Sequence, residues 1–592
     1  MEIIERIAKL RDLMKENKMD AYIISSFDAH QSEYVATHWK GREWVSGFTG
    51  SAGTLVVTLE TAGLWTDGRY YIQAEKQLKG SGIQLFRMMD PGVPFYTKWL
   101  AQTLNAGSTV GCYGETFSID LVNRMTADFV ETSINLSIEL DLLDSLWIDR
   151  PSIPQEPLFL HEIKYAGKTS IEKLAEIRKS MGEVAATHHL LTSLDDIAWL
   201  LNIRGNDVQN NPVVISYVIV TQEQCYLYVN LAKVSSKVQL ELAKMGIELC
   251  EYQSVYDFLD RLGNDESITY DTSKTNALLE QAIPDDVTKI ERPNVTTNLK
   301  AIKNNTEIEN MQVAAIKDGV AMVKFIKWLK EHVGTMPITE IDAEVQLEAF
   351  RKEQHDFFGP SFDTIAGYKD HAALMHYKAA KETQYQLEQE GFFLVDSGGQ
   401  YLDGTTDITR TIVLGDVTER QKRDYTLVLQ GFIALSAAQF LHGSTGSHLD
   451  ILARQPIWQH GIDYKCGTGH GVGFFLNVHE GPQSIRNDLN PVVLEKGMVL
   501  TNEPGIYLEG EYGIRIENML VVEESQKTTF GQFMHFKTMT YCPIDLEGVN
   551  FEQLTIAEKN WLNHYHQMVY TVLSPYLNQN EKTWLAKETR TI

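Results

Sequence analysis

The chain has 592 residues, of which 43% are apolar and 22% are charged, as in an average soluble globular protein. This composition excludes a disordered chain, a collagen and a coiled coil, and the length predicts about four domains. The net charge of −26 makes nucleic acids and anionic membranes poor partners, whereas a divalent cation or a cationic substrate would suit the surface.

The cysteine content and the N-terminus predict a cytoplasmic protein. Five cysteines are too few and too scattered for a disulfide framework. Residues 1–19 carry acids where a secretory signal would need a basic start, and the spacing of their apolar residues predicts an amphipathic helix instead. No run approaches the ~20 apolar residues of a membrane span, so we expect no membrane partner.

Residues 1–150 mix predicted strands and helices. A buried strand is predicted over 21–26, and strand-like runs follow at 53–59 and 63–73. The three prolines of DRPSIPQEP (149–157) indicate the first linker. The first unit is therefore expected to be an α/β domain.

A second α/β unit, residues 158–297, repeats this order of elements. A predicted helix at 170–181 precedes strand-like runs at 213–220 and 225–231. IISSFDAH in the first unit resembles LLTSLDDI in the second, and in both a glycine-containing turn and paired strands follow. The repeated order indicates a diverged internal duplication.

The third unit, residues 298–592, begins with helices and ends in a helical tail (about 540–592). Thr306 and Glu309 form a capping-box pattern ahead of a long amphipathic helix, and a second helix is predicted to start near Thr339. The strand-rich part that follows contains every pattern with chemical meaning.

Two aspartates lie at predicted strand ends in FFLVDSGGQYLDGTTDITRTIVLG (392–415). FFLV is typical of a buried strand that runs into Asp396, and the alternating DITRTIVL begins with Asp407. Glycines between them predict a turn, so the strands should pair as a hairpin with both carboxylates at its open end. Neighbouring buried acids resist ionising together unless a cation holds them. For this segment alone, two turn-forming aspartates are the alternative.

Two histidines and two glutamates follow in similar positions. Glycines flank His470 in CGTGHGVG, so the backbone there allows close approach, and His479 follows in the same segment. A phosphate-binding loop is disfavoured because no lysine follows and the glycine spacing is wrong. Glu503 ends a predicted strand before a Pro-Gly turn, and Glu517 shares one face of the alternating run YGIRIENMLVV with Arg515.

Together these residues form a ligand set for metal ions. Four carboxylates and one imidazole come from strand or turn positions of one domain: Asp396, Asp407, His470, Glu503 and Glu517. This hard, oxygen-rich set suits Mn, Co, Fe or Zn in a two-metal site, and not a thiolate-bound structural zinc. Two metals that share a hydroxide lower its pKa and produce a nucleophile for amide hydrolysis at neutral pH.

In the same order, these segments resemble the metal-binding segments of the pita-bread metallopeptidases, which include methionine aminopeptidase, prolidase and aminopeptidase P. The segments are VDSGGQYLDGTTDITRT, GTGHGVG, NVHEGP, TNEPG and GIRIEN. Within that family the chain looks like the cytosolic-type, three-domain aminopeptidase P (Xaa-Pro aminopeptidase) group, through GFTGSAG, LWTDGRYYIQA, LDDIAWLLNIRG and NWLNHYH as well. The resemblance implies two creatinase-like N-terminal α/β domains followed by an α+β pita-bread catalytic domain with a curved, pseudo-symmetric sheet.

The resemblance also assigns the ligands. Asp396 would chelate one metal, and Asp407 and Glu517 would bridge both. His470 and Glu503 would complete the second metal. The family expectation is two divalent ions, Mn²⁺ first, with Co²⁺, Fe²⁺ or Zn²⁺ as alternatives.

Three further residues match active-site positions of the family. His376, in ALMHYKA, would hold the substrate or stabilise the tetrahedral intermediate, and His479 would lie near the scissile peptide or its leaving proline nitrogen. Arg515 would pair with an active-site carboxylate and keep it ionised. Where many relatives carry a further histidine this chain has Cys466, which we expect to be a small buried thiol beside the loop.

The implied function is removal of the N-terminal residue from Xaa-Pro-Yaa peptides, by attack of a dimetal-bridging hydroxide on the scissile carbonyl. A prolidase-type dipeptidase shares the ligands and is the alternative, but the doubled N-terminal domains favour the aminopeptidase. An inactive pita-bread domain that works as a binding module is disfavoured because all five ligands are kept. The resemblance also implies a homodimer. Structural roles are expected for four other histidines: His188, His189, His564 and His566.

Overall fold

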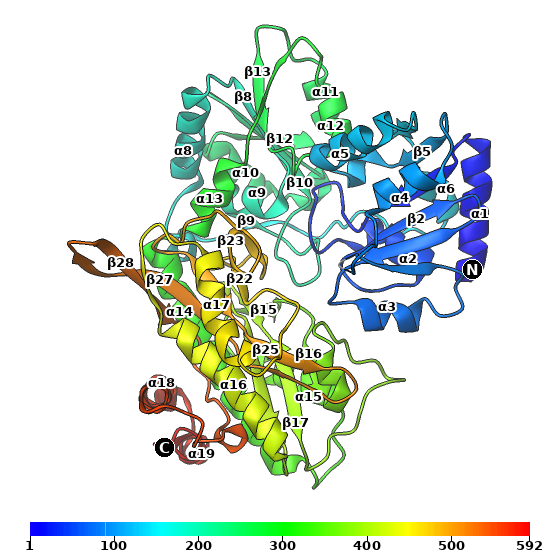
Figure 1. Ribbon diagram of the computed structural model, residues 1–592. Coiled ribbons are helices and arrows are strands. Elements are labelled where there is room, and N and C mark those ends of the chain that lie inside the picture. Colours follow the sequence, from blue (N-terminus) through cyan, green and yellow to red (C-terminus); the bar gives the residue numbers. More distant parts are fainter. Residues whose placement is uncertain (89) are drawn as a thin grey trace. The chain divides into compact units, whose positions relative to one another are not determined.

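The protein, seen in a computed structural model that describes residues 1–88 and 90–592, consists of two compact units (Figure 1). Unit 1 comprises residues 1–161 and 168–296, and unit 2 comprises residues 162–167 and 297–592. None of the described helices combines the length and the apolar composition that a membrane span requires.

The first sheet of unit 1 has the strand order β4-β3-β2-β1-β5-β6. Its strands are β1 (Ala21–Ile24), β2 (Thr54–Thr58), β3 (Ala62–Thr66), β4 (Gln84–Arg87), β5 (Thr109–Cys112) and β6 (Asn135–Ser137). The helices are α1 (Ile3–Glu16), α2 (Gly41–Ser46), α3 (Tyr71–Gln77), α4 (Tyr96–Thr103), α5 (Ile119–Val130) and α6 (Leu142–Leu146). The strand predicted over 63–73 is wrong beyond Thr66, because Asp67 and Arg69 form a turn there and Tyr71 begins a helix.

The second sheet of unit 1 has the order β12-β11-β10-β8-β13-β14. Its strands are β8 (His188–Leu191), β10 (Ser216–Thr221), β11 (Cys225–Val229), β12 (Ile247–Glu251), β13 (Ser267–Tyr270) and β14 (Thr288–Glu291), and a small pair is formed by β7 (Phe159–Leu160) and β9 (Ile203–Arg204). The helices are α8 (Ser170–Glu183), α9 (Leu194–Leu201), α10 (Ser236–Lys244), α11 (Ser254–Leu259), α12 (Ala277–Gln281) and, at the unit boundary, α13 (Val295–Ala301).

The two sheets correspond strand for strand, as the predicted duplication requires. In each, the central strand (β1 or β8) pairs antiparallel with one neighbour and parallel with the other. The outer pairs also agree in direction, since β3–β4 and β11–β12 are parallel, as are β5–β6 and β13–β14. One topology is therefore built twice in unit 1.

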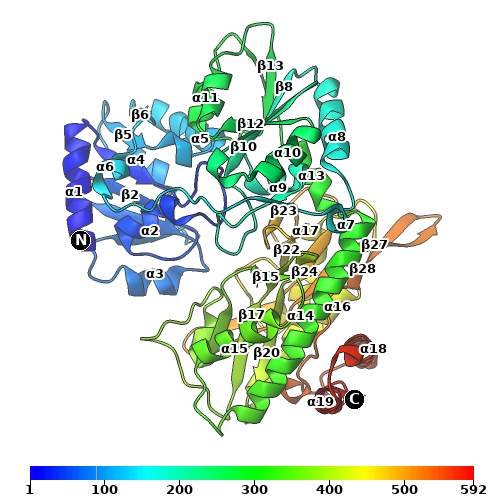
Figure 2. The same ribbon diagram turned by 180° about the vertical axis from the view of Figure 1, so that it is seen from behind.

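Unit 2 is built from two helix pairs packed on strands (Figures 1 and 2). Its helices are α7 (Ile163–Ala166), α14 (Asn305–His332), α15 (Glu340–Lys352), α16 (Glu419–Ser436), α17 (Gly446–Trp458), α18 (Ile556–Leu573) and α19 (Gln579–Glu588). One apolar cluster joins α14 and α15 to β16 (Ile365–Tyr368), β17 (Phe392–Ser397) and β20 (Ile408–Val413). Another joins α16 and α17 to the six-stranded sheet.

The six-stranded sheet of unit 2 has the order β21-β28-β27-β24-β22-β23. Its strands are β21 (Gln439–Leu441), β22 (Gly469–Gly471), β23 (Glu480–Ile485), β24 (Val499–Asn502), β27 (Asn518–Thr528) and β28 (Gly531–Thr538). Smaller sheets contain β15 (Phe357–Pro360), β18 (Gly399–Tyr401), β19 (Gly404–Thr405), β25 (Gly505–Leu508) and β26 (Tyr512–Arg515). Two helix pairs, each on its own sheet, agree with the two similar halves expected of the catalytic fold.

The start of α14 differs from the prediction. Asn304 is the N-cap: its Oδ1 accepts the Glu307 N–H at 3.0 Å, and the Glu307 carboxylate accepts the Asn304 N–H at 2.9 Å. Thr306 and Glu309, predicted to form the capping box, therefore lie within the helix. α15 begins directly after its N-cap Thr339, where a helix start was predicted.

Candidate metal centre

The two aspartates of the ligand set lie at one end of a hairpin. In the antiparallel pair β17–β20, Asp396 is opposite Thr409, and Asp407 directly precedes β20. The segment that connects the strands leaves them at this end and forms its own short hairpin, β18–β19. The carboxylates therefore lie at the connected end and not, as predicted, at the open end.

The other three ligands come from the second half of unit 2. His470 is the middle residue of β22, and Glu503 directly follows β24. Glu517 lies between β26, which pairs with β25, and β27, which pairs with β24. The strand predicted over 512–522 is thus interrupted, and Glu517 occupies the place where the chain crosses from one sheet to the other.

These ligands lie close together. The His470 Nε2 atom is 3.4 Å from Asp407 Oδ2 and 3.6 Å from Glu503 Oε1. One ligand atom each of Asp407, His470 and Glu517 lies within 4.8 Å of the others. Asp407 and Glu517 are buried, whereas His470 and Glu503 are partly exposed, so the centre is accessible from their side.

Asp396 belongs to the same centre through its charge and its hydrogen bonds. The Arg515 Nη2 atom lies 2.5 Å from Asp396 Oδ2. The other oxygen, Oδ1, is buried and has no hydrogen-bond partner among the described residues. A buried carboxylate oxygen without a partner is unfavourable unless a cation contacts it, so this atom fits a metal ligand.

The electrostatics of the centre show how unfavourable it is for bare carboxylates. Burial raises the pKa of Asp396 to about 6, and the charges of Asp407 and Glu503 add to the effect against the opposing charge of Arg515. Burial and the same neighbouring acids raise the pKa of Glu517 well above its ordinary value. Burial alone lowers the pKa of His470, but its hydrogen bond to Asp407 and the charge of Glu503 raise it to about 9. Divalent cations would replace these protons, so the donor set fits two of them.

Arg515 and Thr409 connect the ligands to one another. Arg515 donates from Nε to Thr409 Oγ1 at 3.0 Å and from Nη1 to the Tyr507 hydroxyl at 2.7 Å, in addition to its contact with Asp396. The Thr409 hydroxyl in turn donates to Glu517 Oε2 at 2.6 Å. The guanidinium therefore fixes Asp396 directly and Glu517 through one hydroxyl.

The two candidate catalytic histidines lie in loops beside these strands. His479 directly precedes β23, and its ring lies edge-on to the His470 ring with centroids 4.4 Å apart. His376 lies in the turn after the 3₁₀ helix η4 (Lys369–Ala373), which packs against β17 and β26, the strands that carry Asp396 and Arg515.

The four histidines expected to be structural belong to other elements than the ligands do. His188 and His189 are in β8 of unit 1, and His564 and His566 are in α18. Cys466 is partly buried against an apolar cluster, and burial, together with the charge of Glu503, raises the pKa of its thiol to about 11.

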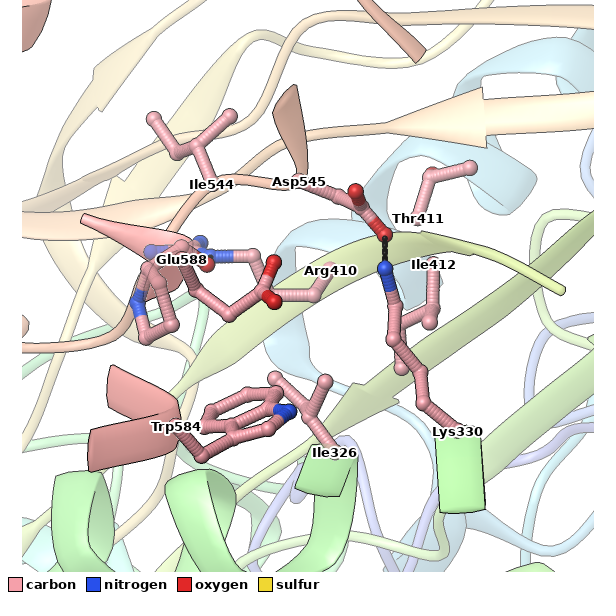
Figure 3. Close-up of a pocket in the computed structure, with 10 residues that line it drawn as sticks. Ile326, Lys330, Arg410, Thr411, Ile412, Ile544, Asp545, Trp584 and Glu588 are labelled. Carbon is pink, nitrogen blue, oxygen red and sulfur yellow. Dashed lines mark hydrogen bonds and ion pairs between the residues drawn. The ribbon is translucent and has the colours of Figure 1, made fainter. Parts of the chain in front are cut away.

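Arg410, a buried arginine that was not identified from the sequence, hydrogen-bonds to the backbone of Glu517. It points to the opposite side of β20 from Thr409 and donates to the Glu517 carbonyl at 2.6 Å, the Asn518 Oδ1 at 2.9 Å and the Tyr565 hydroxyl at 2.9 Å. A pocket on that side is bordered by the ion pair of Lys330 with Asp545 and does not include the ligands (Figure 3). The signal in the sequence was an arginine between two threonines in a buried strand.

Four family matches divide the chain. Residues 309–524 match metallopeptidase family M24, and residues 532–592 match the C-terminal region of that family. Residues 6–145 and 149–307 each match the creatinase/prolidase N-terminal domain.

Similar proteins cover the whole chain. It is 40% identical over 609 residues to Xaa-Pro aminopeptidase 1 of Dictyostelium discoideum, with 99% of this chain and 96% of the relative covered. It is 38% identical over 613 residues to a probable Xaa-Pro aminopeptidase P of Paracoccidioides brasiliensis (strain Pb03), with 99% of each covered. The crystal structure of the X-prolyl aminopeptidase from Caenorhabditis elegans, described as a cytosolic enzyme with a di-nuclear active site, covers 100% of both chains at 33% identity and a TM-score of 0.96.

The first prediction concerns stability without and with metal. Because the pKa values of Asp396 and Glu517 are raised, the folded metal-free centre binds protons more tightly than the unfolded chain, and its stability falls as the pH rises through about 6. Adding Mn²⁺ should therefore raise the unfolding temperature more at pH 7.5 than at pH 5.5. Glu517→Gln, measured in parallel, should lose most of the increase. Equal increases at both pH values in both proteins would contradict the assignment.

Proposed function

Because this chain belongs to metallopeptidase family M24, together with Xaa-Pro aminopeptidases that match it over nearly its whole length, we propose that it removes the N-terminal residue from peptides whose second residue is proline. The observation that carries the proposal is the ligand set, in which oxygens of Asp407 and Glu517 and a nitrogen of His470 lie within 4.8 Å of one another. The ligand assignments remain those proposed from the sequence: Asp396, Asp407, His470, Glu503 and Glu517.

Two divalent cations held by these residues would supply an activated water for attack on the scissile carbonyl and would polarise that carbonyl. The oxygen-rich donor set favours manganese among the candidate metals. The description of the C. elegans enzyme as di-nuclear supports a pair of ions.

The side chains of the chain would do the remaining work. A proline nitrogen must gain a proton to leave as a secondary amine, and the imidazole of His479, beside His470, would deliver it. His376, in the turn after η4, would donate a hydrogen bond to the developing oxyanion. Arg515 would keep Asp396 ionised through its charge.

The finer assignments rest on separate support. We place the domain boundaries at residues 1–150, 158–297 and 298–592, consistent with the proline-rich segment 149–157 and with one six-stranded sheet in each of the first two domains. A cytoplasmic location is supported by the description of the C. elegans enzyme as cytosolic. A homodimer is proposed from the family resemblance alone.

A prolidase-type dipeptidase remains the second candidate because it would use the same ligands. The full-length match to Xaa-Pro aminopeptidases, which includes both N-terminal domains, favours the aminopeptidase. The peptide with a free amino group and proline in second position is the expected partner in either case.

The substrate preference distinguishes the two. After chelation and restoration of Mn²⁺, we expect metal-dependent cleavage of an Xaa-Pro-Yaa tripeptide, little cleavage of the Xaa-Pro dipeptide, and none of a matched Xaa-Ala-Yaa tripeptide, as followed by chromatography of the products. A preference for the dipeptide would identify a prolidase. No cleavage of either proline peptide by the metal-loaded protein would refute the proposed function.

The histidine roles predict a loss of turnover without a loss of metal. His376→Ala and His479→Ala should each lower kcat by about 10²- to 10⁴-fold, because each removes a proton donor to the transition state and neither removes a metal ligand. Metal content measured by atomic absorption should stay at the wild-type value. His564→Ala, on the exposed side of α18, is the matched control and should leave both quantities unchanged. A variant of His376 or His479 with wild-type kcat would remove that residue from the mechanism.

A further inference from the structure

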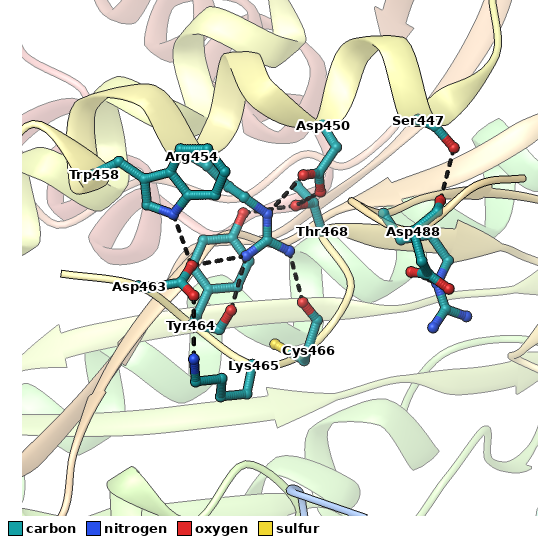
Figure 4. Close-up of polar contacts among 11 residues, drawn as sticks. Ser447, Asp450, Arg454, Trp458, Asp463, Tyr464, Lys465, Cys466, Thr468 and Asp488 are labelled. Carbon is teal, nitrogen blue, oxygen red and sulfur yellow. Dashed lines mark hydrogen bonds and ion pairs between the residues drawn. The ribbon is translucent and has the colours of Figure 1, made fainter. Parts of the chain in front are cut away.

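A buried arginine on α17 contacts the backbone of the segment that leads to His470 (Figure 4). The side chain of Arg454 is 0% exposed. It donates from Nη1 to the Tyr464 carbonyl and from Nη2 to the Cys466 carbonyl, both at 2.8 Å. Its guanidinium also lies over the Tyr464 ring, 3.9 Å from the centroid. One planar group thus fixes three points of a segment without regular structure.

Asp450, one turn earlier on the same helix, continues this contact along the segment. Its Oδ2 accepts from Arg454 Nε at 2.6 Å, and its Oδ1 accepts from the Thr468 hydroxyl at 2.5 Å. The Thr468 and Tyr464 hydroxyls lie 2.6 Å apart. We call these four residues, Asp450, Arg454, Tyr464 and Thr468, the α17 clamp.

The α17 clamp ends on two metal ligands. The Thr468 carbonyl accepts the backbone N–H of Glu503 at 2.8 Å, so the position of that residue depends on Thr468. Two residues after Thr468, the His470 N–H donates to Thr501 Oγ1 at 3.0 Å, and the same hydroxyl donates to Glu503 Oε1 at 3.2 Å. Thr501 therefore holds His470 and Glu503 relative to each other, and a chain of hydrogen bonds from Arg454 through Asp450 and Thr468 reaches the backbone of Glu503.

Three of the four hydrogen-bond partners of Arg454 lie on this one segment: the Tyr464 and Cys466 carbonyls and, at 3.2 Å, the Asp463 carboxylate. A buried ion pair adds little net stability compared with apolar residues of the same shape, so stability alone does not explain why Arg454 and Asp450 are buried here. A lysine would keep the charge but could not make the forked contact to two carbonyls and two carboxylates.

We infer that Arg454 and Asp450 are positioning residues for one of the two metals, the one that His470 and Glu503 complete. This inference rests on the ligand set of the proposed function. The other metal depends on Asp396, which is fixed by Arg515 and not by the α17 clamp. Loss of the clamp should therefore affect the two metals unequally.

The test is a Mn²⁺ titration of full-length metal-free protein by equilibrium dialysis, with thermal unfolding measured in parallel. Wild type should bind two equivalents. In Arg454→Lys one equivalent should keep its wild-type affinity while the other weakens by about 10- to 100-fold, the usual effect of removing a partner that orients a ligand. Excess Mn²⁺ should restore kcat of the variant with KM for the peptide unchanged.

Two further variants keep the test decisive. Thr468→Val removes only the hydroxyl that joins Asp450 to the segment. It should weaken binding of the same equivalent of Mn²⁺ by a smaller factor. If Arg454→Lys does not fold, this variant tests the positioning role in its place. Arg204→Lys alters a buried arginine of unit 1 that donates to the Ala198 and Ile203 carbonyls, and it should leave both equivalents unchanged.

The outcomes separate this inference from the proposed function. Wild-type binding of both equivalents by folded Arg454→Lys, or an equal loss of both, would overturn the positioning role. A wild-type protein that binds no Mn²⁺ would instead refute the ligand set itself. Selective loss of one equivalent in Arg454→Lys and Thr468→Val, but not in Arg204→Lys, would establish the inference.

Discussion

Repulsion among acids around one imidazole is the constraint on which the rest of unit 2 depends. Burial and neighbouring charges raise the pKa of both Asp396 and Glu517, so the folded centre is unfavourable as a set of bare anions. Such a fold must orient each carboxylate through neighbouring protein groups and leave at least one of its oxygens available to a cation. The unpartnered Oδ1 of Asp396 is the plainest example.

Three buried arginines provide that outer support, each for a different part of the ligand set. Arg515 contacts Asp396 directly, whereas Arg410 and Arg454 act on the backbone that carries Glu517 or leads to His470. Arginine is suited to this work because it keeps its proton when buried and presents several donors in one plane. Metal binding and folding are therefore coupled. The arginines orient the ligands, and the cations offset the repulsion among the carboxylates.

The four carboxylates of the proposed ligand set could be identified from the sequence because each lies at or beside a predicted strand end, where a buried acid is otherwise hard to explain. The break in the strand over 512–522 could not, because residues 512–517 alternate as in one strand and the apolar run 519–522 that follows is equally typical of a strand. Arg454 and Asp450 have the spacing of an ordinary exposed helix pair, and only the packing of α17 shows that they are buried.

The start of α14 shows a second limit of prediction from sequence. Asn304 with Glu307 and Thr306 with Glu309 both fit a capping box, so the local pattern does not choose between them. The choice comes from a distant contact, because the Asn304 amide also donates to the Ala166 carbonyl at 2.9 Å. The strand order repeated in unit 1, by contrast, followed from a repeated order of elements that the sequence does show.

The central claim is that the five ligands hold two cations side by side. The most direct measurement is the anomalous scattering of crystals grown with Mn²⁺. We predict two peaks about 3.5–4 Å apart, both in contact with Asp407 and Glu517, one also with Asp396 and the other with His470 and Glu503. A single peak, or peaks that do not touch Asp407 and Glu517, would contradict the account.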